Sequence, residues 1–139
     1  MPAAADTFSG SCLCRECVYQ IDGDIEPAGV CHCEDCRKVT GSPFGVSFRV
    51  LKDRFRLEGR TASFSKTADS GAVLTRHFCP SCGSPLFTES ETHSEAIYVK
   101  AGTLDQPEAI RIERQAWMVS RVDWATIPPG VATYQKGRS

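Results

Sequence analysis

The sequence of 139 residues contains no long hydrophobic run. A helix that spans a bilayer needs about 20 consecutive apolar residues, and no stretch of the chain approaches that length. The first residues, Met1 to Asp6, also lack the cationic segment and apolar core of a secretory signal. We therefore expect no membrane partner and a location in the cytoplasm, where thiols stay reduced.

The sequence also lacks a strong charge of either sign and any linker-like segment. Its 16 basic and 17 acidic side chains give a formal net charge of -1. Nucleic-acid-binding domains usually carry a basic surface, so nucleic acid is not an expected partner. The hydrophobic content of 41% is ordinary for a folded protein. We expect a single domain over residues 8–135.

Short β-rich segments recur along the chain, separated by glycine and proline. Strands are expected at 18–22, 44–50, 55–58, 62–65, 72–78, 85–88, 96–100 and 110–113. Gly10-Ser11 predicts a turn and Pro27-Ala28-Gly29 a break. Residues 34–40 could form one or two helical turns that end at Gly41. This pattern predicts an antiparallel, mainly β domain.

The end of the chain carries both tryptophans. Trp117 and Trp124 are expected to be core or near-core residues that cover the sheet. Residues 136–139 are expected to form a frayed basic tail.

Cysteine, by contrast, is abundant. Eight cysteines fall into three groups with chelating spacing, at positions 12, 14 and 17, at 31, 33 and 36, and at 79 and 82. In a reducing compartment such groups are typical of metal sites and not of disulfides. The last pair stands in Phe-Cys-Pro-Ser-Cys-Gly, a zinc-knuckle sequence in which the glycine lets backbone amides approach the sulfurs.

Spacing alone leaves the partition of the cysteines open. Cys79 and Cys82 could share an ion with two cysteines of the first group or with two of the central group. Two closed four-cysteine sites are also possible, with Cys17 completing the central group. In that arrangement both metals would be purely structural.

The central group opens the stretch from Cys31 to Ser42. We interpret Cys31, Cys33 and Cys36 as three thiolates that hold a zinc ion and leave its fourth position open for a substrate. Three thiolates make zinc a poor Lewis acid, but such an ion can still bind and deprotonate an incoming thiol. This ligand set therefore favours forming or breaking carbon–sulfur bonds.

An anionic centre that receives another thiolate needs positive charge nearby. Arg37 and Lys38 follow the triad directly and are the predicted substrate-binding residues, with Arg37 as the first candidate. Arg49 and Arg76 lie on neighbouring expected strands and could contribute.

The histidines are expected to support the sites without binding metal. His32 is interpreted as a neighbour of the triad that points away from it. His77 would share a strand face with Cys79 and could donate a hydrogen bond to a sulfur.

Four motifs in order carry a resemblance to a known family. They are Gly10-Ser11-Cys12-Leu13-Cys14, Cys31-His32-Cys33-x-x-Cys36-Arg37-Lys38-x-x-Gly41-Ser42-x-Phe44, Phe78-Cys79-Pro80-x-Cys82-Gly83-Ser84-Pro85-Leu86 and Ala101-Gly102-Thr103-Leu104-Asp105-x-Pro107. Together they resemble the glutathione-dependent formaldehyde-activating enzyme family, which also contains the domain of centromere protein V. The resemblance covers about Gly10 to Gly130.

The resemblance implies two zinc ions per chain. Cys12, Cys14, Cys79 and Cys82 would hold a structural ion, and Cys31, Cys33 and Cys36 would hold the catalytic-type ion. Cys17 departs from the family pattern and is expected to pack without a ligand role. The implied fold is mainly β and of the Mss type, with several small coiled antiparallel sheets tied together by zinc.

The activity implied by the resemblance is that of a carbon–sulfur lyase similar to S-(hydroxymethyl)glutathione synthase. A zinc-bound thiolate of a small thiol such as glutathione would attack a small aldehyde such as formaldehyde. The alternative is a non-catalytic, zinc-stabilised protein-binding module, which the resemblance to the centromere protein's domain allows.

Overall fold

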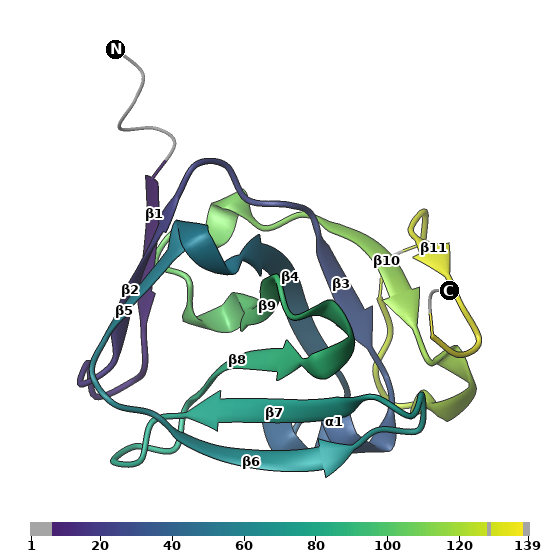
Figure 1. Ribbon diagram of the computed structural model, residues 1–139. Helices are drawn as coiled ribbons and strands as arrows, with labels where there is room; N and C mark the ends of the chain where they lie inside the picture. The colour runs from purple at the N-terminus through teal and green to yellow at the C-terminus, as the bar shows by residue number, and fades with distance from the viewer. Residues whose placement is uncertain (1–6, 128, 138–139) are drawn as a thin grey trace.

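The computed structural model describes residues 7–127 and 129–137, whose strands form two β-sheets (Figure 1). The three-stranded sheet has the order β1-β2-β5, with β1 at Thr7–Ser11, β2 at Val18–Asp22 and β5 at Phe55–Glu58. The eight-stranded sheet has the order β11-β10-β3-β4-β9-β8-β7-β6. Its strands are β3 Ala28–Cys31, β4 Gly45–Leu51, β6 Ala62–Thr67, β7 Val73–Phe78, β8 Pro85–Ser90, β9 Ala96–Lys100, β10 Ile112–Ala116 and β11 Ala132–Thr133.

Helical structure is confined to short segments. The helix α1 at Glu34–Thr40 matches the prediction from sequence. It begins at Cys33, whose sulfur accepts a hydrogen bond from the Cys36 amide, and it ends at Gly41, which has a φ of 62°. Single 3-10 turns lie at Lys52–Arg54, Glu91–His93, Ala101–Thr103, Pro107–Ala109 and Met118–Ser120. Among the described residues, no helix is long and apolar enough to cross a membrane.

The mainly β fold class is confirmed, but the sheets are not purely antiparallel. Strand β10 runs parallel to both β3 and β11. A parallel pair needs a long connection between its strands, and the whole segment from residue 32 to residue 111 provides one between β3 and β10. Sequence periodicity does not reveal such a pairing, because it depends on how distant segments dock.

Three strands were missed from sequence, namely β1, β3 and the two-residue β11, and the first two contain glycine. Gly10-Ser11 lies inside β1 and not in a turn, and Ala28-Gly29 opens β3 and does not break the chain. Gly10 is required because a Cβ there would overlap the Tyr19 ring and the carbonyl oxygen of Thr103. The Tyr19 hydroxyl also bonds Thr103 Oγ1 at 2.8 Å, so this close approach fixes the three-stranded sheet against the segment after β9.

The core lies between the two sheets. Tyr19 and Ile21 of β2 are fully buried, as are Phe48 of β4 and Val99 of β9. The Phe55 ring contacts both Tyr19 and Phe87, with ring centroids 5.2 Å apart in each pair. Burial of these large side chains joins the two sheets into one packed unit.

The end of the chain differs from the prediction. Trp124 is 72% exposed and Trp117 only partly buried, so neither indole is a core residue. Backbone hydrogen bonds hold this segment instead, because the amides of Trp117 and Met118 donate to the carbonyl oxygens of Lys136 and Tyr134. Lys136 is therefore not frayed, and residues 138–139 lie outside the described residues.

Strand register places several polar side chains on one face of the eight-stranded sheet. Directly paired residues share a face, and the pairs are Cys31–Gly45, Ser47–Lys100, Tyr98–Thr88, Thr88–Arg76 and Arg76–Phe64. Helix α1 packs against β4 on this face, since a Cβ at Gly45 would lie 3.5 Å from Cys36 Cβ. The opposite face carries Phe48 and Val99 toward the core.

Candidate metal centres

The first candidate centre joins two loops of the chain. Cys12 and Cys14 lie between β1 and β2, and Cys79 and Cys82 lie between β7 and β8. Their sulfur atoms all lie within 4.8 Å of one another, and the Cys12–Cys14 and Cys14–Cys79 sulfur pairs are both 3.7 Å apart. Four sulfurs bound tetrahedrally to zinc lie about 3.8 Å apart, so this arrangement fits a closed four-thiolate site.

Backbone amides support thiolate charge at this centre. The amides of Ser81 and Cys82 approach Cys79 Sγ at 3.4 and 3.5 Å, and the Cys17 amide approaches Cys12 Sγ at 3.3 Å. Hydrogen bonding, first from Ser84, lowers the pKa of Cys82 to about 5. A thiol held in its ionised form is the form that binds a metal.

Cys17 is the cysteine left over from both clusters. Its side chain is fully buried beside Cys12, and its sulfur contacts the carbonyl oxygen of Arg60 at 3.4 Å. Burial raises the pKa of Cys17 to about 11, which favours the neutral thiol. The structure does not bring Cys17 to the central group, so it cannot complete that group as a fourth ligand.

The second candidate centre is formed by Cys31, Cys33 and Cys36, at the end of β3 and the start of α1. The three sulfurs lie within 4.8 Å of one another. Hydrogen bonds within the cluster, first from Cys31, strongly lower the pKa of Cys33, whereas the pKa of Cys31 is raised. The three thiols cannot ionise together unless a cation offsets their charge, so the donor set fits a divalent metal ion.

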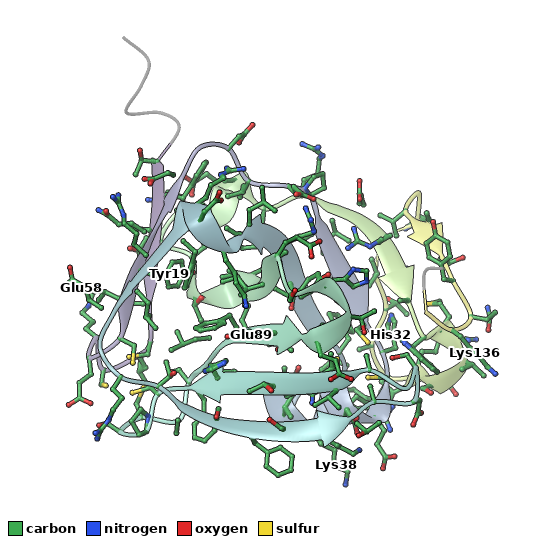
Figure 2. The ribbon with its side chains drawn as sticks, viewed as in Figure 1. Tyr19, His32, Lys38, Glu58, Glu89 and Lys136 are labelled. Atoms are coloured by element: carbon green, nitrogen blue, oxygen red, sulfur yellow. The ribbon has the colours of Figure 1, made fainter. Side chains whose placement is uncertain are left out.

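Among the described residues, no other cysteine, histidine, aspartate or glutamate joins this second cluster. His32 is buried, and its Nε2 pairs with Gln115 Oε1 at 2.8 Å, while its ring meets Phe44 edge-on. His77 stacks on Phe87 and bonds Thr61. Figure 2 shows His32 and Tyr19 on opposite sides of the molecule.

Two cations lie on the same face of the sheet as Cys31. Lys100 lies at the end of β9, and its Nζ is 3.5 Å from Ser47 Oγ. Burial lowers the pKa of Lys100, whereas negative charge on Cys36 acts in the opposite direction. Arg76 is the second cation and also acts on Lys100. Arg76 was considered from the sequence as a cation for this cluster, whereas Lys100 was missed. The only sequence signal for Lys100 is its place at the polar end of an alternating strand.

Two cavities lie beside α1 and share Val39, Phe64 and Arg76, although no cysteine of the cluster lines either one. The first, of about 300 Å³, lies between α1 and the β6–β7 hairpin and is also lined by Glu34, Asp35, Lys38 and Lys66. The second, of about 260 Å³, continues over β7, β8 and β9 and is also lined by His77, Phe78, Gly83, Pro85, Phe87 and Lys100. The structure thus places Lys38 in a cavity wall beside the second cluster.

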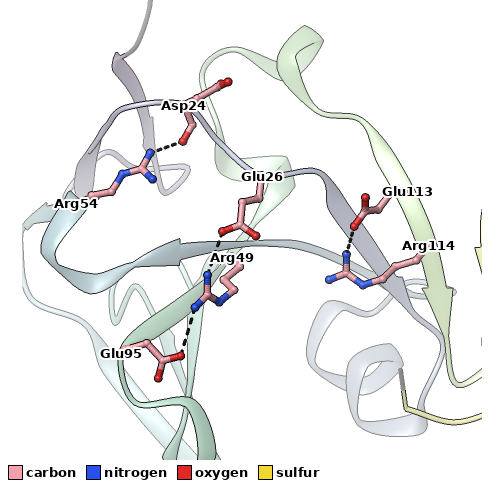
Figure 3. A network of polar contacts seen from close by, with 7 residues as sticks. All are labelled: Asp24, Glu26, Arg49, Arg54, Glu95, Glu113 and Arg114. Atoms are coloured by element: carbon pink, nitrogen blue, oxygen red, sulfur yellow. Dashed lines mark hydrogen bonds and ion pairs between the residues drawn. The ribbon is translucent and has the colours of Figure 1, made fainter. Parts of the chain in front are cut away.

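Arg49 has a different position from the one considered in the sequence analysis. Its guanidinium pairs with Glu26 at 3.1 Å and with Glu95 at 3.3 Å, as Figure 3 shows. The same view shows a hydrogen bond from Arg54 to the backbone carbonyl oxygen of Asp24 and the ion pair Arg114–Glu113. The ion pairs with Glu26 and Glu95 engage the guanidinium of Arg49, so Arg49 is not a free cation for the cluster.

Arg37 fixes the loop that carries the triad. Its Nη1 donates to the carbonyl oxygens of Ser120 at 2.7 Å and His32 at 3.2 Å. Together with the His32–Gln115 bond, this contact fastens α1 to the end of the chain. The assignment of Arg37 and Lys38 to substrate binding stays a prediction, and this geometry favours Lys38.

We expect Arg37→Ala to lower the free energy of unfolding by about 1.5–3 kcal/mol, because it removes charge-assisted hydrogen bonds to two carbonyl groups. Lys38→Ala, its exposed neighbour, should change that free energy by less than about 0.5 kcal/mol. Urea titrations of both variants measure the difference. Equal stabilities would show that the contact to Ser120 contributes nothing.

The fold and the two cysteine clusters define a mainly β protein with one four-thiol and one three-thiol candidate metal centre. The sequence profile described as glutathione-dependent formaldehyde-activating enzyme matches residues 7–120. The chain belongs to this family, which confirms the resemblance found in its motifs.

Two individual proteins illustrate the relationship. An uncharacterized lyase of Schizosaccharomyces pombe is 22% identical over 116 residues, which cover 84% of this chain and 82% of the yeast protein. A crystal structure of a Rhodobacter sphaeroides protein matches with a TM-score of 0.55 and 14% identity over 91% of this chain and 98% of that one. At that identity the second likeness concerns the fold alone.

Proposed function

We propose that the chain is a zinc-dependent carbon–sulfur lyase that joins a small thiol such as glutathione to a small aldehyde such as formaldehyde, and that also catalyses the reverse reaction. The observation that carries this proposal is the three-cysteine cluster, which gains no fourth ligand from the described residues. The helix α1 that carries Cys36 also supplies lining residues to two cavities. Family membership and the lyase name of the yeast relative support the same reaction class.

Both cysteine clusters would hold zinc in this proposal, with Cys12, Cys14, Cys79 and Cys82 as the structural set and Cys31, Cys33 and Cys36 as the catalytic-type set. Zinc bound by three thiolates supplies a position at which a substrate thiol is held as its thiolate. None of the eight cysteines forms a disulfide. The proposal includes a cytoplasmic location, where thiols stay reduced.

The cavity beside α1 suits the thiol substrate. Its wall carries two acidic residues, Glu34 and Asp35, together with the cations Lys38, Lys66 and Arg76. Asp35 and Lys66 already pair at 2.6 Å across this cavity. A zwitterionic thiol such as glutathione carries charged groups of both signs, so it can contact both sets while its sulfur reaches the cluster.

The reaction is an addition that needs no oxidant or reductant. The sulfur forms a bond to the carbonyl carbon, the π pair of the C=O bond moves to oxygen, and the proton lost by the thiol ends on that oxygen. Cleavage of the adduct reverses each of these changes. The neighbouring cations Lys100 and Arg76 would stabilise negative charge as it moves to oxygen.

The test is the exchange of ¹³C-formaldehyde with its glutathione adduct, followed by NMR exchange spectroscopy. We expect the exchange rate to rise in proportion to protein concentration and to return to the uncatalysed value when zinc is removed by a chelator. A protein that holds both ions and leaves the exchange rate at background would contradict the proposal. That result would favour the zinc-stabilised protein-binding module instead.

A further inference from the structure

The cavity over β7, β8 and β9 is larger and more apolar than the binding of formaldehyde requires. Its lining is largely apolar and aromatic, with Val39, Phe64, Phe78, Pro85 and Phe87. Its volume is about 260 Å³. A two-heavy-atom aldehyde is about the size of a water molecule, which takes about 30 Å³ in the liquid. Most of this cavity would therefore stay unfilled by formaldehyde, whereas its volume is near the lower end of the range for small-molecule sites.

Two cations lie in the same wall without a carboxylate partner. The ion pairs of the described residues engage Arg49, Lys52, Arg56, Lys66, His77 and Arg114, but neither Lys100 nor Arg76. The only described side-chain bond of Lys100 is the long one to Ser47 Oγ at 3.5 Å, although an ammonium group has three donors. Both cations are only partly exposed to water. A cation that has lost part of its hydration without gaining a partner is costly, so this wall is suited to an anionic group.

Lys100 also fixes where that anionic group would lie. Register puts Lys100 on the same sheet face as Cys31, and its ammonium group is within electrostatic range of all three cysteines of the cluster. An anion bound to Lys100 would thus lie at the end of the cavity that shares a sheet face with Cys31, while the aromatic lining extends away over β7 and β6. A substrate that fits both must carry its anionic group close to its reacting carbon.

We propose that this cavity binds the carbonyl substrate and that this substrate is a 2-oxo acid with an apolar side chain. Lys100 and Arg76 hold its carboxylate, and Phe64, Phe78 and Phe87 contact its side chain. This inference rests on the proposed thiol–carbonyl chemistry and changes only the carbonyl partner. The thiol stays in the adjoining mixed-charge cavity, whose acidic residues Glu34 and Asp35 would repel a simple carboxylate.

The bond changes match those of an aldehyde addition. The thiol sulfur forms a bond to the 2-oxo carbon, and the π pair of that carbonyl moves to its oxygen. The thiol proton ends on the same oxygen, which gives a thiohemiketal that still carries its carboxylate. No electrons are gained or lost, and the reverse step releases thiol and 2-oxo acid.

Calorimetric binding of phenylglyoxylate to the zinc-loaded protein tests the subsite independently of turnover. The matched probes are methyl phenylglyoxylate, which lacks the charge, and glyoxylate, which lacks the apolar group. We expect the wild type to bind phenylglyoxylate about 10- to 100-fold more tightly than either probe, as a charge-assisted contact allows. Lys100→Met should reduce this preference over the ester to less than about threefold, and Lys100→Arg should keep most of it.

Arg76→Gln provides a second variant in the same cavity, in case Lys100→Met does not fold. It should weaken phenylglyoxylate binding but not ester binding. Equal affinities of the wild type for acid and ester would overturn the inference. The inference would also be overturned if Lys100→Met lost its metal and bound all three probes more weakly to the same extent. Lys100 would then only balance the charge of the thiolates. If either substitution weakens the binding of glutathione but not that of phenylglyoxylate, the two cations bind a carboxylate of the thiol substrate, and the inference is wrong.

Exchange kinetics separate this inference from the proposed function. With glutathione as the thiol, ¹³C NMR saturation transfer measures the rate of adduct formation with phenylglyoxylate and with formaldehyde. We expect the acid to react faster at equal concentration. If only formaldehyde is turned over, the proposed function stands and the 2-oxo acid is wrong. If neither compound is turned over but phenylglyoxylate binds through Lys100, the binding site stands and the proposed reaction is wrong.

Discussion

Replacing Cys79 by serine will remove the metal of the four-cysteine centre and leave the chain largely unfolded at 37 °C. We expect the free energy of unfolding to fall by more than about 4 kcal/mol. Binding of zinc to small zinc-finger peptides contributes about 10–16 kcal/mol, whereas a whole domain is stable by only about 5–15 kcal/mol. Loss of even a third of such a contribution would therefore consume most of the stability of a chain of this size.

The position of the four-cysteine centre explains the size of this effect. It joins the β1–β2 loop of the small sheet to the β7–β8 loop of the large sheet, segments that are more than sixty residues apart in sequence. Cys79 is fully buried, and its sulfur accepts bonds from the amides of Ser81 and Cys82. A serine there would leave those amides without their sulfur acceptor and three thiolates without a closed tetrahedron.

The measurements are metal content, circular dichroism and urea titration of the purified variant. Cys17→Ala is the matched control, since Cys17 is equally buried in the same region but lies outside the cluster. That control should keep two zinc ions per chain and lose no more than about 1.5 kcal/mol. If Cys79→Ser were as stable as Cys17→Ala, the four-cysteine centre would have no structural role.

The cysteine spacing carried the most reliable information in the sequence. Thiols two residues apart in Cys12-x-Cys14 or three apart in Cys79-x-x-Cys82 can reach one ion whatever the rest of the fold does, because their spacing is local. Which pair meets which is a matter of tertiary structure. Spacing left that partition open, the family resemblance implied it, and the structure brings together the implied four.

Features that depend on sheet register could not be read from sequence. Lys100 faces the second cluster only because Ser47 pairs with it, and because Gly45 on the same strand pairs with Cys31. Arg49, two residues further along β4, reaches Glu26 and Glu95 instead. Lys100 and Arg49 are each a cation in a strand of alternating apolar residues. The local sequence pattern therefore cannot show which of them faces the cysteine cluster and which forms a surface ion pair.

Hydrophobicity alone was equally misleading at the end of the chain. Trp124 was expected near the core because large aromatic side chains usually bury most of their surface, yet it is 72% exposed. The segment around Trp117 is held by backbone bonds to residues 134–136 and by the contact of Arg37 with Ser120. Arg37 was interpreted as a substrate ligand because it follows the triad, whereas its guanidinium is turned toward this segment.

Replacing Cys36 by alanine will abolish catalysis but leave the chain folded. Cys79→Ser, in contrast, is expected to unfold the chain. We expect kcat/KM for the thiol–carbonyl reaction to fall by more than about 100-fold. Changes in residues that merely orient a metal ligand commonly cost 10- to 100-fold, and this variant removes a ligand. Cys36 is preferable to Cys33 for the test, because Cys33 Sγ also caps α1 by accepting the Cys36 amide.

The free energy of unfolding of Cys36→Ala shows whether the second cluster has a catalytic or a structural role. All three of its cysteines lie within six residues of one another, so an ion there crosslinks little of the chain and its loss should cost less than about 1.5 kcal/mol. Parallel urea titrations and exchange assays of Cys36→Ala and Cys79→Ser make the comparison. If Cys36→Ala lowered stability as much as Cys79→Ser and left the exchange rate intact, the triad would be a second structural site. Because the described residues supply no fourth ligand, we expect the opposite outcome, with activity lost and the fold retained.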